Sequence, residues 1–226
     1  MKYRAIIFDM DGTIVNTEHL WHKATATLIA KRGISLSAQD QQTLHQQLSG
    51  LDVYQSCAVI KQLISSTESV TELIAEKTAL ALSFYQENIA FIDGFIDFHH
   101  KATQLKLKLG VATNANDATL LLTKKYLSLD SFFGNHLYGI SSVSNVGKPN
   151  PAIYLHAAQQ LQVEPRQCIA IEDSANGIKA AKNAGMLCIG ITTSGNPHQT
   201  QHADIIVDTY NRIDLRRLLE LPIEEL

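Results

Sequence analysis

The apolar segment Ala5–Phe8 stops at two carboxylates and a glycine, in the order Asp9-Met10-Asp11-Gly12. A short apolar run without polar interruptions is typical of a parallel strand that is covered on both faces. Side chains two residues apart on extended backbone point the same way, so Asp9 and Asp11 are able to reach one site. Two like charges in one pocket repel each other, and a bound divalent cation is the usual compensation. A buried strand that ends at a charged site is therefore the first expectation.

Two plainer interpretations of this motif have to be weighed. The acids could be solvated turn residues that simply follow a strand, and nothing within the motif itself excludes this. A calcium-binding loop is disfavoured, because Gly12 comes too early and no glutamate closes the loop.

Length and charge limit the class of protein. The 226 residues suffice for one large domain, or for one domain with a sizeable insertion. A formal net charge of −3 gives no positive field for nucleic acid or an anionic membrane, so neither is expected as a partner. No apolar run approaches the roughly 20 residues of a membrane span, and the early first strand leaves no room for a secretion signal. Three widely spaced cysteines, Cys57, Cys168 and Cys188, are typical of core residues in a reducing compartment. A cytoplasmic monomer is expected.

Residues 17–89 differ in pattern from the rest of the chain. Apolar residues in the segment that Gly33 ends recur at helical spacing, for example Leu20, Ala24 and Leu28. Further helices are expected over 38–48, from about 52 to 64, and from 70 to about 86. No convincing strand is found in this part, which therefore predicts an all-helical unit.

From residue 90 onward, strands and helices alternate. Strands are expected at 109–113, 137–140, 168–172, 187–191 and 205–207, and helices at 94–105, 117–127, 151–161, 175–184 and 212–220. This alternation predicts a doubly wound, parallel α/β sheet of Rossmann type. The core would comprise residues 1–16 and 90–226, with residues 17–89 inserted after the first strand as a helical cap. Ligands of such sheets bind at the carboxyl ends of the strands, so a cap inserted there would act as a lid.

Polar residues follow several of the expected strands or lie in the adjoining loops. They are Asp9 with Asp11, Thr113 with Asn114, Lys148 with Pro149, and Glu172 with Asp173. Each group alone has an ordinary explanation, such as a helix cap or a surface lysine. Together they are more specific, because each falls where the ends of parallel strands converge.

This set resembles the haloacid dehalogenase superfamily of phosphatases that use an aspartate nucleophile. The similar stretches, in matching order, are Phe8–Thr13, Val111–Asn114, Gly147–Pro151 and Ile171–Gly177. The helical insertion is similar to that of the branch with β-phosphoglucomutase, phosphoglycolate phosphatase and the hexose- and hexitol-phosphate phosphatases. The resemblance implies a phosphoric monoester hydrolase that acts on a small phosphorylated metabolite, such as a sugar or polyol phosphate.

The resemblance also implies catalytic and metal-binding roles. Asp9 would attack the phosphorus and carry an aspartyl phosphate, and Asp11 would be the general acid and base. Mg²⁺ is the implied cofactor. Its ligands would be Asp9, the backbone carbonyl of Asp11 and Asp173, with Glu172 supporting the ion through water.

Phosphate and substrate contacts follow from the same resemblance. Thr113, Asn114 and Lys148 would hold the phosphoryl oxygens, and Thr113 and Lys148 are counted with the catalytic residues for this reason. Trp21 could offer the sugar an apolar wall or an indole donor, although a position in the core would explain it equally well.

A phosphomutase is the first alternative function. Mutases of this branch hold a second phosphate with a Lys-Gly-x-x-Arg type segment, where this chain has Ser49-Gly50-Leu51-Asp52-Val53. Their Ser and Lys after the second strand correspond to Ala115-Asn116, and their cap histidine corresponds to Trp21. These departures favour a phosphatase. A catalytically silent binding protein is disfavoured because the catalytic set is complete, and a haloacid dehalogenase is disfavoured by Asp11.

Overall fold

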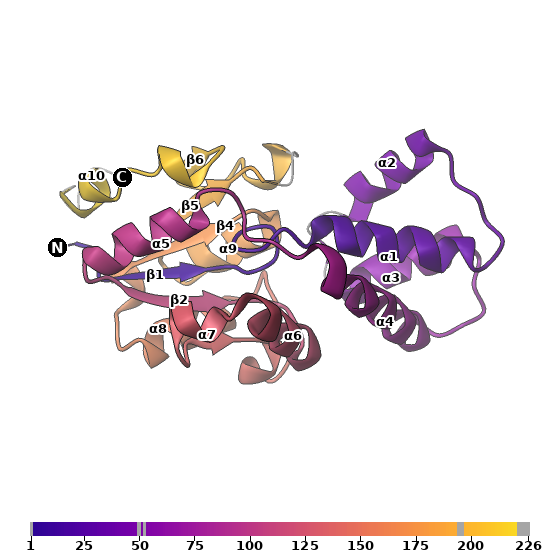
Figure 1. The fold of residues 1–226 in the computed structure, drawn as a ribbon, viewed down its shortest axis with the longest axis horizontal. Coiled ribbons are helices and arrows are strands. Elements are labelled where there is room, and N and C mark those ends of the chain that lie inside the picture. Colours follow the sequence, from indigo (N-terminus) through magenta and orange to yellow (C-terminus); the bar gives the residue numbers. More distant parts are fainter. Residues whose placement is uncertain (1, 49–50, 52, 194–196, 221–226) are drawn as a thin grey trace. The chain divides into compact units, whose positions relative to one another are not determined.

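The computed structural model describes residues 2–48, 51, 53–193 and 197–220. The chain divides into two compact units. One consists of Met1–Asn16 together with Ala90–Leu226, and the other of Thr17–Ile89. Figure 1 shows a sheet flanked by helices in the first unit, and helices but no strand among the described residues of the second.

The larger unit contains, within its described residues, a six-stranded sheet in the order β3-β2-β1-β4-β5-β6. The strands are β1 (Ala5–Phe8), β2 (Lys108–Ala112), β3 (Leu137–Tyr138), β4 (Cys168–Glu172), β5 (Leu187–Ile191) and β6 (Ile205–Val207). All neighbouring strands pair in parallel. The strand order reverses at β1, which is paired with β2 on one side and β4 on the other. This confirms the predicted doubly wound α/β fold, and the loops after β1, β2 and β4 meet at one edge.

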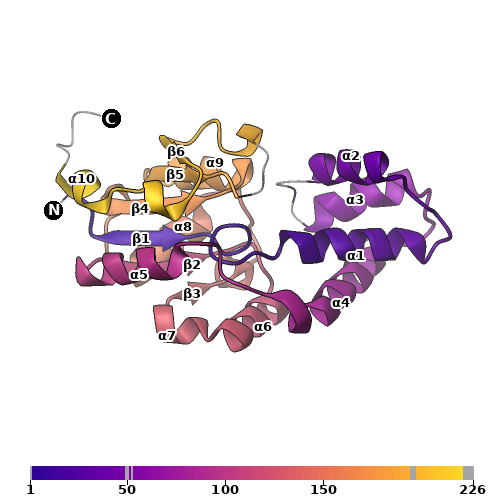
Figure 2. The same cartoon turned by 45° about the horizontal axis from the view of Figure 1, so that its top comes forward.

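Helices cover both faces of this sheet (Figure 2). They are α5 (Phe95–Gln104), α6 (Asp117–Leu127), α7 (Leu129–Phe133), α8 (Ala152–Gln160), α9 (Ala175–Asn183) and α10 (Leu215–Glu220). Ile7 shares a hydrophobic cluster with Tyr154 of α8 and Ile178 of α9. The ring of Phe8 packs 5.7 Å from that of Phe95 in α5. Because adjacent side chains of a strand point to opposite faces, β1 is buried on both, which explains its uninterrupted apolar sequence.

Two elements differ from the sequence prediction. The strand expected over 137–140 ends at Tyr138, and Ile140–Val143 form the 3-10 helix η1 instead. The short helix α7 is not predicted by periodicity, because five residues span little more than one turn. Ser128, with a left-handed φ of 50°, separates α7 from α6.

The smaller unit has a hydrophobic core of its own. Its helices are α1 (Glu18–Ala30), α2 (Ala38–Leu48), α3 (Val53–Leu63) and α4 (Val70–Asn88). One cluster joins all of them through Leu28, Leu44, Ile60 and Leu73. A capping box formed by the Ser69 and Glu72 side chains fixes the start of α4.

Polar contacts also join the helices of the smaller unit. The Arg32 guanidinium, just after α1, lies 2.6 Å from a carboxylate oxygen of Glu68 and 2.7 Å from one of Glu76. The rings of His22 in α1 and His45 in α2 stack with their centres 3.8 Å apart and their planes 6° from parallel. The two imidazoles therefore form part of the packing between α1 and α2.

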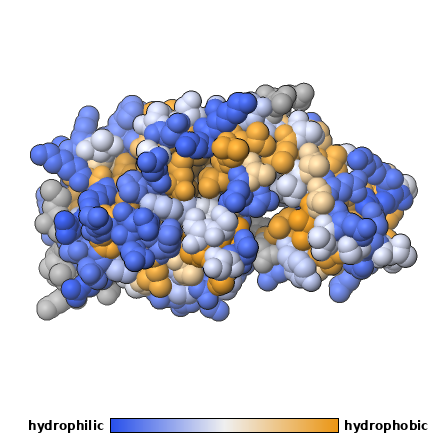
Figure 3. Space-filling view, turned by 90° about the horizontal axis from the view of Figure 1, so that it is seen from below, coloured by the Kyte–Doolittle hydropathy of each residue, from blue (hydrophilic) through white to orange (hydrophobic). Residues whose placement is uncertain are grey.

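The surface carries hydrophilic residues with hydrophobic ones between them, as the face drawn in Figure 3 shows. Large exposed apolar side chains include Leu121, Tyr54, Leu63 and Ile206. Exposed apolar residues are ordinary on globular proteins, so they do not by themselves indicate a docking site. In the part of the chain that the structure describes, no helix is long and apolar enough to cross a membrane.

Candidate active site

The loop after β1 carries Asp9 and is fixed against the loop after β4. The backbone N–H of Asp9 donates to the carbonyl of Ile171 (2.9 Å), and the Thr13 hydroxyl donates to Asp173 Oδ1 (3.3 Å). Gly12 has a φ of +82°, and a Cβ atom there would lie only 2.2 Å from Asp173 Oδ2. The turn therefore requires glycine both for its conformation and for the close approach of the Asp173 carboxylate.

Lys148 lies between η1 and α8, and its ammonium is buried between two carboxylates. Nζ is 2.5 Å from Asp9 Oδ1 and 2.6 Å from Glu172 Oε1, and the lysine side chain is only 3% exposed. The backbone N–H of Lys148 donates to Asn114 Oδ1 (2.9 Å). The structure thus brings together Asp9, Asn114 and Lys148 from separate loops and Glu172 from the end of β4.

The Glu172 carboxylate at the end of β4 is fully buried and accepts several hydrogen bonds. Oε2 accepts from the backbone N–H groups of Asp173 and Ser174 (3.1 Å each) and from the Ser174 hydroxyl (2.9 Å). Oε1 accepts from the Tyr154 hydroxyl (2.9 Å) as well as from Lys148. The donors just before α9 satisfy Oε2, and Tyr154 and Lys148 satisfy Oε1, so Glu172 is held in one orientation.

Thr113 follows β2 directly and is buried. Its Oγ1 accepts from the backbone N–H of Ala115 (3.0 Å). Since Phe8 of β1 pairs with Val111 of β2, Thr113 lies at the same sheet edge as Asp9. The structure therefore gathers Asp9, Thr113 and its neighbour Asn114 on adjacent loops, as expected for parallel strands.

Asp11 and Trp21 are the remaining predicted site residues. Asp11 is half-buried in the loop after β1, where it forms a backbone bridge with Val15. Trp21 belongs to α1 of the helical unit, with Lys77 Nζ 6.0 Å from its ring centre. The proton-transfer role of Asp11 and the substrate-binding role of Trp21 both stay predictions.

An acidic cluster occupies the carboxyl ends of β1 and β4. Carboxylate oxygens of Asp9, Glu172 and Asp173 all lie within 4.8 Å of one another. The cluster holds three carboxylates, and the Lys148 ammonium pairs with two of them, so negative charge is in excess. Oxygen donors alone are the ligands that Mg²⁺ and Ca²⁺ prefer. The donor set therefore fits a hard divalent cation, which would offset the excess charge.

Burial affects the titration of the groups at this site. Burial raises the pKa of Asp9 well above its ordinary value, the Lys148 ammonium opposes this, and Glu172 adds to the rise. Burial alone would lower the pKa of Lys148, but Asp9 and Glu172 outweigh it and raise that pKa, so the lysine stays charged. Burial also raises the pKa of Tyr154 well above its ordinary value, so its hydroxyl remains a donor.

Three residues outside the predicted set of site residues, Ser174, Gly177 and Tyr154, also shape this site. Ser174 caps α9 by accepting from the N–H of Gly177 (3.1 Å) while it donates to Glu172. A Cβ atom on Gly177 would lie 1.7 Å from Glu172 Oε1. Ser174, directly before the helix expected from 175, was a usable signal, because serine is a preferred N-cap residue. Tyr154 gave no signal, because its hydroxyl meets Glu172 only through the tertiary fold.

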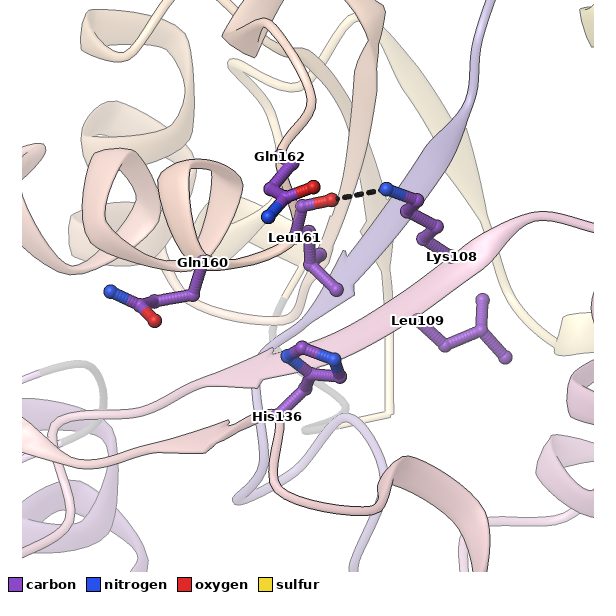
Figure 4. Close-up of a pocket in the computed structure, with 6 residues that line it drawn as sticks. All are labelled: Lys108, Leu109, His136, Gln160, Leu161 and Gln162. Carbon is purple, nitrogen blue, oxygen red and sulfur yellow. Dashed lines mark hydrogen bonds between the residues drawn. The ribbon is translucent and has the colours of Figure 1, made fainter.

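A separate recess lies at the amino ends of the strands (Figure 4). Its volume is about 370 Å³, and the lining residues are Lys108, Leu109, His136, Gln160, Leu161 and Gln162. The Lys108 ammonium donates to the carbonyl of Leu161 (2.7 Å) at the end of α8. Since β2 begins at Lys108, the recess is at the edge of the sheet opposite to the acidic cluster and is not part of the candidate active site.

The chain belongs to the haloacid dehalogenase-like hydrolases, whose family model matches residues 3–185. It is 32% identical over 208 residues to validoxylamine A 7'-phosphate phosphatase from Streptomyces hygroscopicus subsp. limoneus, covering 91% of this chain and 93% of the relative. It is 27% identical over 225 residues to hexitol phosphatase B from Escherichia coli strain K12, covering 95% of this chain and 96% of the relative.

A solved structure supports the same assignment. β-Phosphoglucomutase from Clostridium difficile superposes with a TM-score of 0.79 at 25% identity, covering 96% of both chains. The family and the fold expected from the sequence are therefore confirmed. Over nearly its whole length, the chain is similar both to named phosphatases and to a named mutase.

Proposed function

We propose that the protein is a Mg²⁺-dependent phosphatase that hydrolyses small phosphomonoesters of sugars or polyols through an aspartyl phosphate on Asp9. The observation that carries this proposal is the buried Lys148 ammonium, 2.5 Å from Asp9 Oδ1, beside the acidic cluster. The names of the relatives, a hexitol phosphatase and the phosphatase of a 7'-phosphate, support the substrate class.

Hydrolysis would take place in two displacements. In the first, an Asp9 carboxylate oxygen bonds to phosphorus as the bond from phosphorus to the sugar oxygen breaks, and Asp11 gives its proton to that oxygen. In the second, Asp11 takes a proton from water, whose oxygen bonds to phosphorus while the bond to Asp9 breaks. Inorganic phosphate leaves, and Asp9 and Asp11 return to their starting states.

The other residues would stabilise the charge that the phosphoryl group carries. Lys148, Thr113 and Asn114 are proposed to bind its oxygens, because they lie on loops at the same sheet edge as Asp9. Trp21 is proposed as a contact for the sugar or polyol.

A bound Mg²⁺ would supply positive charge that offsets the carboxylates and the phosphoryl oxygens. The carboxylates of Asp9 and Asp173 and the carbonyl of Asp11 are the proposed ligands. Glu172, whose two oxygens already accept hydrogen bonds within the protein, would act through water.

A phosphomutase is the second candidate, and the superposition on β-phosphoglucomutase favours it. The sequence argues against a mutase, because this chain lacks cations at the positions where mutases have them. Ser49, Gly50 and Asp52 of that segment lie outside the described residues. Asn116, at the position of a mutase lysine, caps α6 by accepting from the N–H of Thr119 (2.9 Å). A catalytically silent binding protein is a third candidate, which any turnover would exclude.

One assay separates these functions. Release of inorganic phosphate is measured with sugar phosphates, polyol phosphates, phosphoglycolate and nucleotides, with and without Mg²⁺. The proposal requires Mg²⁺-dependent release that is fastest with a sugar or polyol phosphate. Fastest release from phosphoglycolate or a nucleotide would refute the substrate class, and no release from any of them would refute the phosphatase itself.

The setting of the enzyme is also a proposal. All three cysteines are buried and unpaired, which suits a reducing compartment such as the cytoplasm. We propose that the protein acts there as a monomer, with its small substrate as its only obligatory partner.

A further inference from the structure

Tyr154 is a fully buried residue near the start of α8 that contacts the acidic cluster. Its hydroxyl donates to Glu172 Oε1 at 2.9 Å. Its ring also lies beside the cation, with Lys148 Nζ 5.0 Å from the ring centre. One side chain therefore contacts both members of the buried ion pair between Lys148 and Glu172.

The two oxygens of Glu172 have different surroundings. Among the described residues, Oε2 accepts hydrogen bonds from its sequence neighbours Asp173 and Ser174 only. Oε1 accepts from Tyr154 (2.9 Å) and from Lys148 (2.6 Å), so the phenol and the ammonium share one acceptor. A neutral donor on Oε1 disperses part of its charge and weakens its hold on the ammonium.

The Lys148 ammonium also pairs with a second carboxylate. Its Nζ is 2.5 Å from Oδ1 of Asp9, which is the proposed nucleophile. Without the Tyr154 hydroxyl, the ammonium would be the one donor that the described residues offer Oε1, and it would be drawn towards Glu172. Its contact with Asp9, and with a phosphoryl group in transfer, would weaken.

We infer that Tyr154 is a positioning residue for the reaction, because its hydroxyl holds Glu172 Oε1 and thereby keeps the Lys148 ammonium shared with Asp9. This inference rests on the proposed phosphatase function and goes beyond it by naming a residue that touches neither substrate nor metal. A purely structural tyrosine would need only its ring, which packs in the cluster with Ile153 and Ala157.

The test compares Tyr154→Phe with Tyr138→Phe. Tyr138 is a matched control, because its hydroxyl is also within hydrogen-bond distance of one partner, His136 Nδ1 (2.8 Å), and is remote from Glu172 in the bonding network. Tyr154→Phe should lower kcat about tenfold and change KM less than about twofold. Its affinity for vanadate, which imitates the phosphoryl group in transfer, should fall by about the same tenfold factor. Tyr138→Phe should change none of these.

A second readout does not depend on turnover. The ¹H–¹⁵N signal of the Lys148 ammonium, assigned by its loss in Lys148→Met, should shift in Tyr154→Phe and stay in place in Tyr138→Phe. An unmoved signal would overturn the inference, as would unchanged kcat and vanadate affinity in an active enzyme, or an equal loss in the control. Absence of turnover in the wild-type protein would refute the proposed function instead, and the ammonium signal would then decide the positioning role alone.

Discussion

At the scale of single residues, the site depends on one buried cation that two carboxylates share. Lys148 Nζ is within hydrogen-bond distance of both Asp9 and Glu172, and Asp173 lies in the same acidic cluster. Removing one partner of a buried charge pair leaves the other without compensation, whereas an isosteric amide keeps a hydrogen bond. Conservative variants therefore separate chemical roles from structural ones.

Asp9→Asn should lower kcat by at least about 10³-fold, because an amide oxygen is a poor nucleophile towards phosphorus. The protein should remain folded, since the amide oxygen can still accept from Lys148. Phosphate release and thermal unfolding measure the two effects. Near-normal turnover would rule out a covalent intermediate on Asp9.

Gly12→Ala should weaken metal binding as well as folding. Its φ of +82° costs about 1–2 kcal/mol for any residue with a Cβ, and that Cβ would push the Asp173 carboxylate away. Gly185→Ala is the matched control, with a φ of +79° and no atom within 4 Å of the added Cβ. Urea unfolding should show a lower free energy of unfolding in both variants. Only Gly12→Ala should raise the Mg²⁺ concentration needed for half-maximal activity, and equal Mg²⁺ dependence would contradict the proposed role of Asp173.

At the scale of elements, the packing of α1 on α2 in the helical unit is expected to depend on pH. Burial lowers the pKa of His22 to about 4, and the nearby His45, Lys77 and His19 contribute in the same direction. The Glu18 carboxylate, 3.7 Å from His22 Nε2, is the acidic group beside it. Because the pKa in the folded state is below the ordinary value of 6.5, the unfolded chain takes up the proton first as pH falls. Stability is therefore complete above about pH 6.5 and decreases between about pH 6.5 and 4.

Thermal unfolding at pH 7.5 and pH 5 tests this dependence. The wild-type midpoint should fall at the lower pH, and His22→Gln should reduce that fall, because glutamine does not titrate. His100→Gln, at an exposed position of α5, serves as the control, and its midpoint should fall by as much as that of the wild type. An identical fall in all three proteins would exclude the stacked histidines as its source.

The helices and strands also differ in how well the sequence predicts them. The strands expected at 168–172 and 187–191 are observed with those bounds, because strands buried on both faces are continuous apolar runs. Helix α7 and the contact of Tyr154 with Glu172 were not predicted. Both depend on residues that only the tertiary fold brings together, namely the packing of Phe133 on Phe8 and of α8 against the end of β4.

At the scale of the whole molecule, the fold does not distinguish hydrolysis from isomerisation, since phosphatases and a mutase are similar to the chain over nearly its full length. The distinction depends on a second phosphate-binding site. A mutase has to retain a bisphosphate intermediate while that intermediate reorients in the site. Each charged hydrogen bond to the distal phosphate contributes about 1.5–3 kcal/mol to this retention. This chain has the neutral residues Val53 and Asn116 where mutases place cations, and Asn116 is engaged as the cap of α6.

Loss of two such contacts would weaken bisphosphate binding by about 3–6 kcal/mol, enough for water to intercept the aspartyl phosphate first. We therefore expect inorganic phosphate, and no interconversion of glucose 1- and 6-phosphates, in a ³¹P NMR time course. The reaction contains β-glucose 1-phosphate, Mg²⁺ and a trace of the 1,6-bisphosphate, and Asp9→Asn provides the blank. Glucose 6-phosphate that accumulates faster than inorganic phosphate in the wild-type reaction would show that the enzyme is a mutase.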